Sequence, residues 1–232
     1  MTRPYTIVIP AYNEEKRIEK VLAEIADDSG QFIVVCDGND GTEEIVRDFS
    51  RSRPGLALIC LSFDRRLGKG GAVIEGFSHA SSPVVGFLDA DGSTSLSQVL
   101  RLMAALDGAD AVIGSRWLPG SVIPERQGLS RRIESRVFNL AIRLLFGLRF
   151  TDTQCGAKVF KKSAVDAVLR DMTSTGFEFD VELLWRLSKK GYKIIECPIT
   201  WQNKGDSRVT AGDAMRMLSG LLTVRMHGGL PE

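Results

Sequence analysis

Two aspartates stand one residue apart in the segment Leu88-Asp89-Ala90-Asp91-Gly92, directly after an apolar run. Carboxylates at this spacing can hold Mg²⁺ or Mn²⁺, since hard cations prefer oxygen ligands and often take one or two carboxylates plus substrate phosphates. Such an ion can neutralise a departing diphosphate. The same aspartates could instead form a turn that caps the next helix. Their place after a predicted strand favours the metal, so Asp89 and Asp91 are the expected ligands.

A second polar segment, Pro10-Ala11-Tyr12-Asn13-Glu14, follows the first apolar run of the chain. Here the backbone would leave the sheet edge, where a base and ribose could lie. Tyr12 offers an aromatic ring face and Glu14 a hydrogen-bond acceptor. The alternative is an ordinary strand-to-helix loop in which Asn13 is the helix N-cap.

Two glycine-rich loops complete the set. Asp37 and Gly38 follow the second apolar run, and Asp37 or Asp40 could accept hydrogen bonds from a base or ribose. A turn chosen for its backbone angles explains the same residues. Lys69 and Gly70 begin another predicted helix, where backbone N–H groups and the ammonium could meet a base or phosphate. A helix start with a solvated lysine is equally consistent with this loop, which lacks the Walker A spacing.

The segments between these loops predict alternating strands and helices. An alternation of this kind predicts a Rossmann-like α/β fold with a mostly parallel sheet covered on both faces. Ligands of such sheets bind beyond the carboxyl ends of the strands, where Asp37 and Asp89 fall. Strands are expected over Tyr5–Ile9, Gln31–Cys36, Leu56–Leu61 and Val84–Leu88, and helices over Glu14–Ala26, after a possible cap at Thr42, and over Gly70–Ala80.

The alternation loosens beyond residue 95, yet no linker, repeat or low-complexity tract interrupts the chain. We therefore expect one domain over residues 1–232. The remaining predicted helices are Ser97–Leu106, Ser130–Phe146, Val181–Lys190 and Asp213–His227, and the remaining strands are Ala111–Gly114, Ala157–Phe160 and Lys193–Ile199.

The composition excludes several classes of protein. The chain has 232 residues, is 44% hydrophobic and carries a net charge of +1, which does not suit a disordered or nucleic-acid-coating protein. Its four separate cysteines are expected to be buried or half-buried thiols, and two histidines make a His-built zinc site improbable. We expect no signal peptide and no spanning helix, because no apolar run reaches 18 residues. Any membrane contact would then be peripheral, on the cytoplasmic face.

The order of these motifs, followed by Ile113-Gly114-Ser115-Arg116, resembles the GT-A fold of family 2 glycosyltransferases. The later segments 152–160 and 179–184 are similar to polyprenyl-phosphate sugar transferases. Dolichyl-phosphate β-glucosyltransferases are the nearest type and dolichyl-phosphate mannose synthases the second. The resemblance covers about residues 5 to 225. It departs from the family at Cys36, where relatives usually have an aspartate.

This resemblance implies an inverting, metal-dependent transfer of a hexose from UDP-glucose or GDP-mannose to a polyprenyl phosphate. It implies a nucleotide-sugar half over about residues 1–115 and an acceptor half over about 116–232. The expected catalytic residues are Asp89, Asp91, Arg116 and Asp180. The expected nucleotide-sugar contacts are Pro10, Ala11, Tyr12, Asn13, Glu14, Asp37, Gly38, Lys69, Gly70, Asp89 and Ala90, and the expected acceptor contacts are Arg116, Arg131, Gln154 and Arg208.

The predicted helix 130–146 is basic and amphipathic. From Arg116 to Arg149 there are seven arginines and two glutamates, a local charge of +5 in a chain of net charge +1. Such a helix can lie in a membrane interface with its arginines on lipid phosphates. It can equally pack its apolar side on the core or on a partner. That apolar stripe is expected to contain Ile133, Val137, Leu140, Ala141 and Leu144, opposite Arg132, Arg136, Asn139 and Arg143.

Two other functions fit the same motifs. A glycosyltransferase with a glycan or small-molecule hydroxyl acceptor would need a carboxylate base, for which Asp180 or Glu182 could serve. A nucleotide-sugar-binding scaffold subunit of a membrane complex would need no chemistry, and a partner protein could then supply the membrane anchor.

Overall fold

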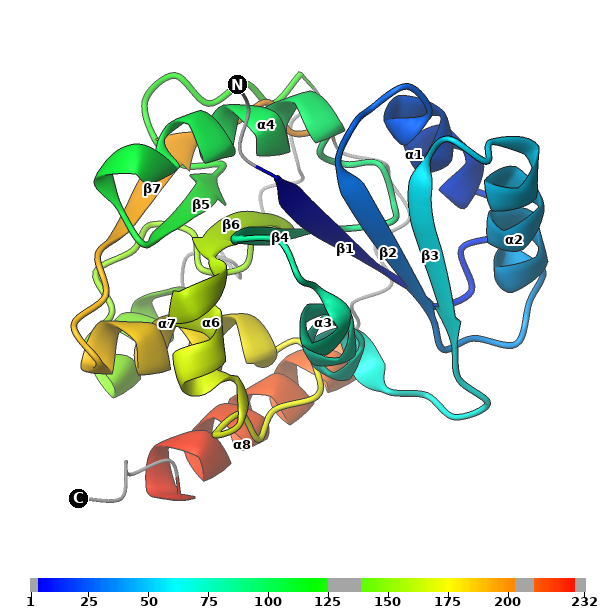
Figure 1. Cartoon of the computed structure of the whole chain (residues 1–232). Helices are drawn as coiled ribbons and strands as arrows, with labels where there is room; N and C mark the ends of the chain where they lie inside the picture. The colour runs from blue at the N-terminus through cyan, green and yellow to red at the C-terminus, as the bar shows by residue number, and fades with distance from the viewer. Residues whose placement is uncertain (1–3, 125–138, 203–210, 228–232) are drawn as a thin grey trace.

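The sheet of this protein has seven strands, with helices packed on both of its faces (Figure 1). The computed structural model describes residues 4–124, 139–202 and 211–227. The strands are β1 (Tyr5–Ala11), β2 (Gln31–Cys36), β3 (Ala57–Ser62), β4 (Val84–Leu88), β5 (Ala111–Ser115), β6 (Ala157–Lys161) and β7 (Ile194–Pro198). The helices are α1 (Ile18–Ile25), α2 (Thr42–Ser52), α3 (Gly68–His79), α4 (Leu96–Ala104), α6 (Lys162–Leu169), α7 (Phe179–Lys189) and α8 (Ala211–His227), with a helix over 139–146 and a 3₁₀ turn at Leu106–Gly108.

The strand order is β3-β2-β1-β4-β6-β5-β7. The central strand β1 pairs in parallel with β2 on one side and with β4 on the other. The chain therefore reverses its direction of travel across the sheet between β1 and β4, which is where open α/β sheets bind their ligands. The loops after β1, β2 and β4 meet at this edge.

Strand β6 is the antiparallel member of the sheet and lies between β4 and β5. Its first residue, Ala157, is paired with Leu88, the last residue of β4. Because β6 runs opposite to β4, the chain that enters β6 lies beside the carboxyl end of β4. A mostly parallel α/β fold is confirmed, and this antiparallel strand adds residues 152–156 to the predicted ligand edge.

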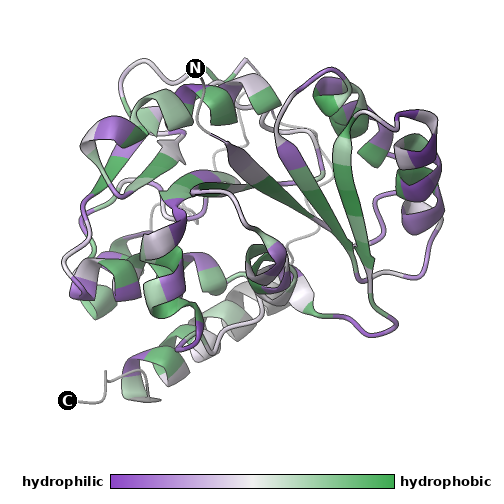
Figure 2. Cartoon of the chain, in the orientation of Figure 1, coloured by the Kyte–Doolittle hydropathy of each residue, from purple (hydrophilic) through white to green (hydrophobic). Residues whose placement is uncertain are grey.

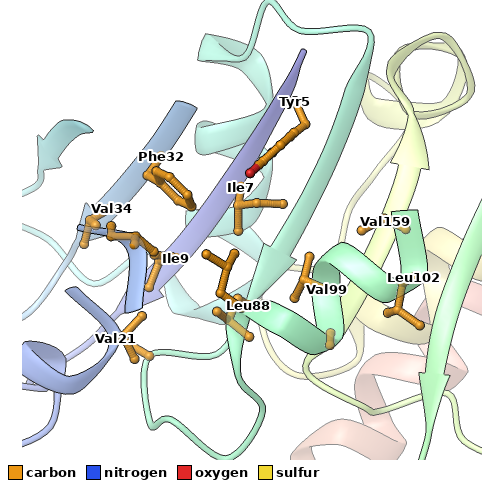
Figure 3. Packing of buried hydrophobic residues seen from close by; sticks show 14 of the residues in the cluster. Tyr5, Ile7, Ile9, Val21, Phe32, Val34, Leu88, Val99, Leu102 and Val159 are labelled. Carbon is orange, nitrogen blue, oxygen red and sulfur yellow. The ribbon is translucent and has the colours of Figure 1, made fainter. Parts of the chain in front are cut away.

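Two apolar cores lie on opposite faces of the sheet because successive strand residues point to opposite sides. Ile7 and Ile9 of β1 pack with Val99 and Leu102 of α4 and with Val21 of α1 (Figure 3). The other face of β1 and β4 packs on α3, α6, α7, α8 and helix 139–146. The strands are the most hydrophobic part of the ribbon, whereas α2 is largely hydrophilic (Figure 2). The four cysteines are free thiols, buried or half-buried as expected.

Several predicted boundaries were wrong. Helix α1 begins at Ile18 rather than Glu14, so Asn13 is not its N-cap, and Thr42 makes no capping hydrogen bond in α2. The sequence pattern also missed α6 altogether. In the described part of the basic helix, residues 139–146, Asn139 was placed on the polar side but is buried, whereas Arg143 is exposed as expected. Leu144, on the apolar stripe, is 77% exposed. The part before residue 139 lies outside the described residues.

Candidate active site

Asp89 is the first residue after β4, and the backbone before β6 holds it in place. Its N–H donates to the carbonyl oxygen of Gly156 at 3.1 Å. A Cβ atom at position 156 would overlap the Asp89 carboxylate, so only glycine leaves that carboxylate where it is. Asp91 lies in the following turn, where its Oδ1 accepts the N–H of Ser93 at 2.8 Å. The two predicted aspartates thus share one loop, and Gly156 is a supporting residue that the sequence did not reveal.

The Lys69 ammonium joins two elements of the site. It lies 3.0 Å from Oδ1 of Asp89 and 3.4 Å from Oδ2 of Asp180. Burial lowers the pKa of Lys69, but the charges of Asp180 and Asp89 outweigh burial and hold that pKa above its ordinary value. The ammonium is therefore a permanent positive charge at the carboxyl end of β4. The structure brings three predicted residues together here, although α3, β4 and α7 supply them separately.

The loops after β1 and β2 are packed directly on one another. Asn13 has a φ of +56°, in the left-handed region, and its side-chain oxygen accepts the N–H of Asn39 at 2.9 Å. Gly38 lies so close that a Cβ there would meet the same Asn13 oxygen. Asn13 and Gly38, both predicted to contact the ligand, therefore join the loop after β1 to the loop after β2. This structural role does not depend on a ligand.

Tyr12 and Glu14 occupy different surroundings. Tyr12 is 36% exposed, and the Arg66 guanidinium lies 4.2 Å from its ring centroid. Glu14 is 9% exposed and receives two hydrogen bonds from Arg17, at 2.6 and 2.7 Å. The accessible ring can stack on a base, whereas the Glu14 carboxylate is already engaged within its own loop.

Asp37 organises the start of α3 rather than standing alone. Its Oδ2 accepts the N–H groups of Leu67 and Gly68 at 2.8 and 3.0 Å. Further along α3, the N–H groups of Gly70 and Gly71 donate to carbonyl oxygens of residues 176 and 175. Protein acceptors therefore use these four N–H groups, and the expected contact of Lys69 and this helix N-terminus with a base or phosphate stays a prediction. A Cβ at Gly70 would also lie 2.5 Å from Cβ of Phe179, so Gly70 is a packing residue.

Glu182 holds the loop that covers the start of α3. Its carboxylate accepts the N–H of Thr173 at 3.1 Å and that of Ser174 at 2.7 Å, and Arg186 donates to it at 2.8 Å. Burial raises the pKa of Glu182, but these hydrogen bonds outweigh burial and keep the pKa below its ordinary value. The side chain is fully buried and paired with Arg186, which does not favour the alternative role of Glu182 as a general base.

Arg116 is held by Asp152 in a bidentate ion pair. Its Nε and Nη2 lie 2.7 and 2.9 Å from the two carboxylate oxygens, and its backbone N–H donates to the same group at 3.0 Å. The Asp152 side chain is 0% exposed, and burial raises its pKa, but Arg116 outweighs burial and lowers it. The sequence singled out Arg116 as an acceptor contact and missed the carboxylate that fixes its direction.

The other predicted site residues differ in how much of each side chain is exposed. Pro10 is half-buried, whereas Ala11 and Ala90 are 1% and 3% exposed, which leaves their side chains facing the core. Gln154 is half-buried, and its N–H donates to Asp152 at 3.3 Å. Arg131 and Arg208 lie outside the described residues.

The donor set at this edge suits a hard divalent cation bound together with a ligand. Within the described part of the chain, no group of three or more His, Cys, Asp or Glu side chains is placed to hold a metal by itself. Asp89 and Asp91 supply two half-buried carboxylates in one loop. Two protein carboxylates completed by phosphate oxygens are a common environment for Mg²⁺. The site therefore fits a metal that arrives with a nucleotide.

A doubly wound sheet with acidic, lysine-bearing loops at its switch point is typical of enzymes that bind nucleotides. Residues 6–169 match the model of glycosyl transferase family 2. The chain therefore belongs to this family and is a glycosyltransferase, as its motifs predicted.

Relatives of known function are similar over most of this chain. It is 31% identical to an undecaprenyl-phosphate mannosyltransferase of Micrococcus luteus, covering 88% of this chain and 87% of that one. It is 30% identical to a dolichyl-phosphate beta-glucosyltransferase of Trichomonas vaginalis, covering 96% and 71%. Glycosyltransferase AglD of Haloferax volcanii is 31% identical, but the matched region is 93% of this chain and 35% of that longer protein.

Solved structures confirm the GT-A fold. Glucosyl-3-phosphoglycerate synthase of Mycobacterium tuberculosis, in complex with Mn²⁺ and UDP, superposes with a TM-score of 0.68 at 19% identity, over 99% of this chain and 81% of that one. Mannosyltransferase PcManGT of Pyrobaculum calidifontis, in complex with GDP-Man and Mn²⁺, has a TM-score of 0.68 at 21% identity, over 100% and 67%.

Proposed function

We propose that this protein transfers a hexose from a nucleoside diphosphate sugar to a polyprenyl phosphate, with inversion at the sugar carbon. UDP-glucose is the first choice of donor and GDP-mannose the second. The names of the relatives support a lipid phosphate acceptor, because they include transferases to dolichyl and undecaprenyl phosphate. We assign the donor to about residues 1–115 and the acceptor to about 116–232.

The observation that carries this proposal is the group formed by Asp89, Asp91 and Lys69 at the carboxyl end of β4. Lys69, near the start of α3, lies 3.0 Å from Asp89, which follows β4 at the switch point of the sheet. Asp89 and Asp91 would hold Mg²⁺ or Mn²⁺, which supplies charge neutralisation of the leaving diphosphate. Tyr12 offers its exposed ring to the base.

The burial and ion pairs of Asp180 and Glu182 favour a phosphate acceptor over a hydroxyl acceptor. A hydroxyl needs a general base within reach, whereas a phosphate monoester is already anionic and needs positioning. Asp180 is 2% exposed and paired with Lys69 and Lys158, and Glu182 is fully buried. Neither carboxylate is available to take a proton from an acceptor. Arg116, which Asp152 directs, is the described guanidinium proposed to bind the acceptor phosphate; Arg131 and Arg208 stay predictions.

The described helices also support a position at a membrane surface. Leu140 and Leu144 are 56% and 77% exposed on helix 139–146, and Met226 is 77% exposed on α8. Arg225 of α8 donates from Nε to the carbonyl oxygen of Leu145 at 3.0 Å, which joins the two helices. Exposed apolar side chains beside arginines suit an anionic lipid interface. Among residues 4–124, 139–202 and 211–227, no helix is long and apolar enough to span a bilayer.

Calorimetric titration and a transfer assay test the proposal. The protein is titrated with UDP-glucose and GDP-mannose with and without Mn²⁺, and product is then measured with a polyprenyl phosphate and with a hydroxyl glycoside. Metal-dependent binding of one nucleotide sugar and transfer to the lipid phosphate are expected. Asp27→Asn, at an exposed aspartate beyond α1, is the control for substitution of Asp89 or Asp91 and is expected to bind and transfer as the wild type does. Transfer to the hydroxyl glycoside alone would replace the lipid acceptor. Nucleotide binding without transfer to either acceptor would leave the nucleotide-sugar-binding scaffold, and absence of nucleotide binding by folded protein would overturn the donor site.

Membrane binding is tested separately with sedimented vesicles of phosphatidylglycerol or phosphatidylcholine. The double variant Leu144→Gln with Met226→Gln is expected to lose binding to the anionic vesicles. Ile59→Gln is the control, because Ile59 is 38% exposed on β3, away from both helices. Equal sedimentation of all three proteins would remove this surface from the proposal.

A further inference from the structure

Lys158 is a charged side chain in the middle of the sheet, and although it lies in the segment 152–160, no role was predicted for it from the sequence. It belongs to β6, its side chain is 0% exposed, and its ammonium lies 5.1 Å from the ring centroid of Phe87. The ammonium donates to the carbonyl oxygen of Cys155 and to Oδ1 of Asp180, both at 2.5 Å. A buried ammonium is costly unless it is paired, so a lysine here needs a reason beyond packing.

Lys158 is the buried end of a row of alternating charges that reaches the active site. Asp180 follows Lys158 at 2.5 Å, Lys69 follows Asp180 at 3.4 Å, and Asp89 follows Lys69 at 3.0 Å. The exposed fraction of these side chains rises along the row, from 0% and 2% to 13% and 33%. Two ammoniums therefore balance two carboxylates, and only the last carboxylate opens to ligand.

Lys69 is shared unequally between its two carboxylates. It lies nearer to Asp89 than to Asp180, although Asp180 is the more buried and would attract a lone cation more strongly. Lys158 lies closer still to Asp180, at 2.5 Å, and so supplies this carboxylate with a nearer positive charge than Lys69 does. Without Lys158, a buried Asp180 would have Lys69 as its remaining ammonium partner in this row.

We infer that Lys158 is a positioning residue, which neutralises Asp180 and thereby keeps the Lys69 ammonium on the donor-side carboxylate Asp89. Asp180 acts in the same row as a spacer between two ammoniums and takes no proton from the acceptor. This inference rests on the proposed function, since it assigns Asp89 to the nucleotide sugar.

The test compares Lys158→Met with the double variant Lys158→Met and Asp180→Asn. In the single variant Asp180 draws Lys69 away from Asp89. The dissociation constants of UDP and GDP with Mn²⁺, and kcat, are then expected to worsen by about 10–100-fold, as for other outer partners of a metal site. The double variant removes both buried charges, so Lys69 returns to Asp89 and most of the loss is recovered.

Two further variants separate charge from packing. Lys158→Gln keeps a hydrogen-bond donor but removes the charge, and it is expected to behave like Lys158→Met. Lys161→Met is the matched control on the same strand, because Lys161 pairs with Asp110 at 2.9 Å and is 39% exposed. The control is expected to bind nucleotide and transfer sugar as the wild type does.

Nucleotide binding and sugar transfer by the double variant decide the inference. A double variant as impaired as Lys158→Met would overturn the charge-balancing role. A double variant that binds nucleotide normally but transfers no sugar would make Asp180 a catalytic group instead. If Lys158→Met does not fold, the comparison runs between Asp180→Asn and the double variant, and poorer binding by the double variant overturns the inference. If the wild type binds neither nucleotide, the proposed function falls. The inference is then judged by urea unfolding: it fails if Lys158→Met and Lys69→Met have additive effects on stability.

Discussion

The loop after β4 and the segment before β6 bring acidic residues to the same edge of the sheet, but they hold them differently. Asp89, after β4, is 33% exposed and has one ammonium at 3.0 Å. Asp152, before β6, is 0% exposed and receives three hydrogen bonds from Arg116. A carboxylate left partly open can bind a ligand, whereas one buried and fully paired stabilises the loop around it. We therefore expect substitution of Asp89 to affect mainly activity, and loss of the ion pair between Arg116 and Asp152 to affect stability as well as the proposed acceptor binding.

The largest expected effect is on stability, from Arg116→Met. This change leaves Asp152 buried without its cation, which costs about 3–5 kcal/mol. Urea unfolding followed by circular dichroism measures the loss. Arg101→Met is the control, since Arg101 is an exposed residue of α4 that donates to one carbonyl oxygen. A loss no larger than that of the control would show that Asp152 is not dependent on Arg116.

Asp89→Asn and Asp91→Asn are expected to lower activity much more than stability. Each removes a carboxylate that faces the proposed metal, so kcat should fall by about 10²–10³-fold, as when a preorganised transition-state contact is lost. The free energy of unfolding should change little, because both side chains are half-buried. Turnover with Mn²⁺ and urea unfolding measure the two quantities. Near-normal turnover by Asp91→Asn would exclude Asp91 from the metal site.

Gly156→Ala tests whether the two regions depend on each other. A Cβ atom here would overlap the Asp89 carboxylate, so that side chain must move away. We expect metal-dependent turnover to fall by about 10–100-fold, like other changes beside a metal ligand. Gly108→Ala is the control, because a Cβ at that position meets no atom within 4 Å. Equal activity of both variants would mean that the position of Asp89 is unimportant.

The smallest expected effect is a change in acid stability from Glu182→Gln. The pKa of Glu182 in the folded protein is below its ordinary value of 4.5. Its contribution is therefore present above pH 4.5 and is lost as the pH falls towards the folded-state pKa. The variant should lose less stability than the wild type between pH 5 and pH 3, measured by urea unfolding at each pH. Glu44→Gln, at an exposed site on α2, should retain the wild-type pH dependence.

Local sequence patterns predicted most of the sheet because buried strands are short apolar runs, and those runs end at the loops that carry Asp37 and Asp89. The same patterns failed where helices were short or packed unexpectedly. The eight-residue helix α6 was missed, and Asn139 was placed on the polar side of its helix although it is buried. Helix periodicity shows that one side is apolar, but the neighbouring elements decide which side meets the core.

Among the site residues, too, some roles followed from the sequence pattern and others did not. Asp89 and Lys69 were predicted because each stands in a polar loop at a strand or helix end. Gly70 was assigned to the ligand, yet Phe179 and the carbonyl oxygen of Ser174 fill the space beside it. A glycine required for packing between two elements cannot be distinguished in sequence from one required for ligand approach.

The sequence by itself determined the α/β class, the family and the acidic pair Asp89 and Asp91, since these follow from short-range patterns and motif order. Only the tertiary structure decided which charges pair. Lys158 lies 2.5 Å from Asp180, a residue 22 positions later on another element, and β6 runs antiparallel to β4 so that Gly156 contacts Asp89. Coulomb and steric interactions act over a few ångströms, and folding alone sets distances of that size between segments remote in the chain.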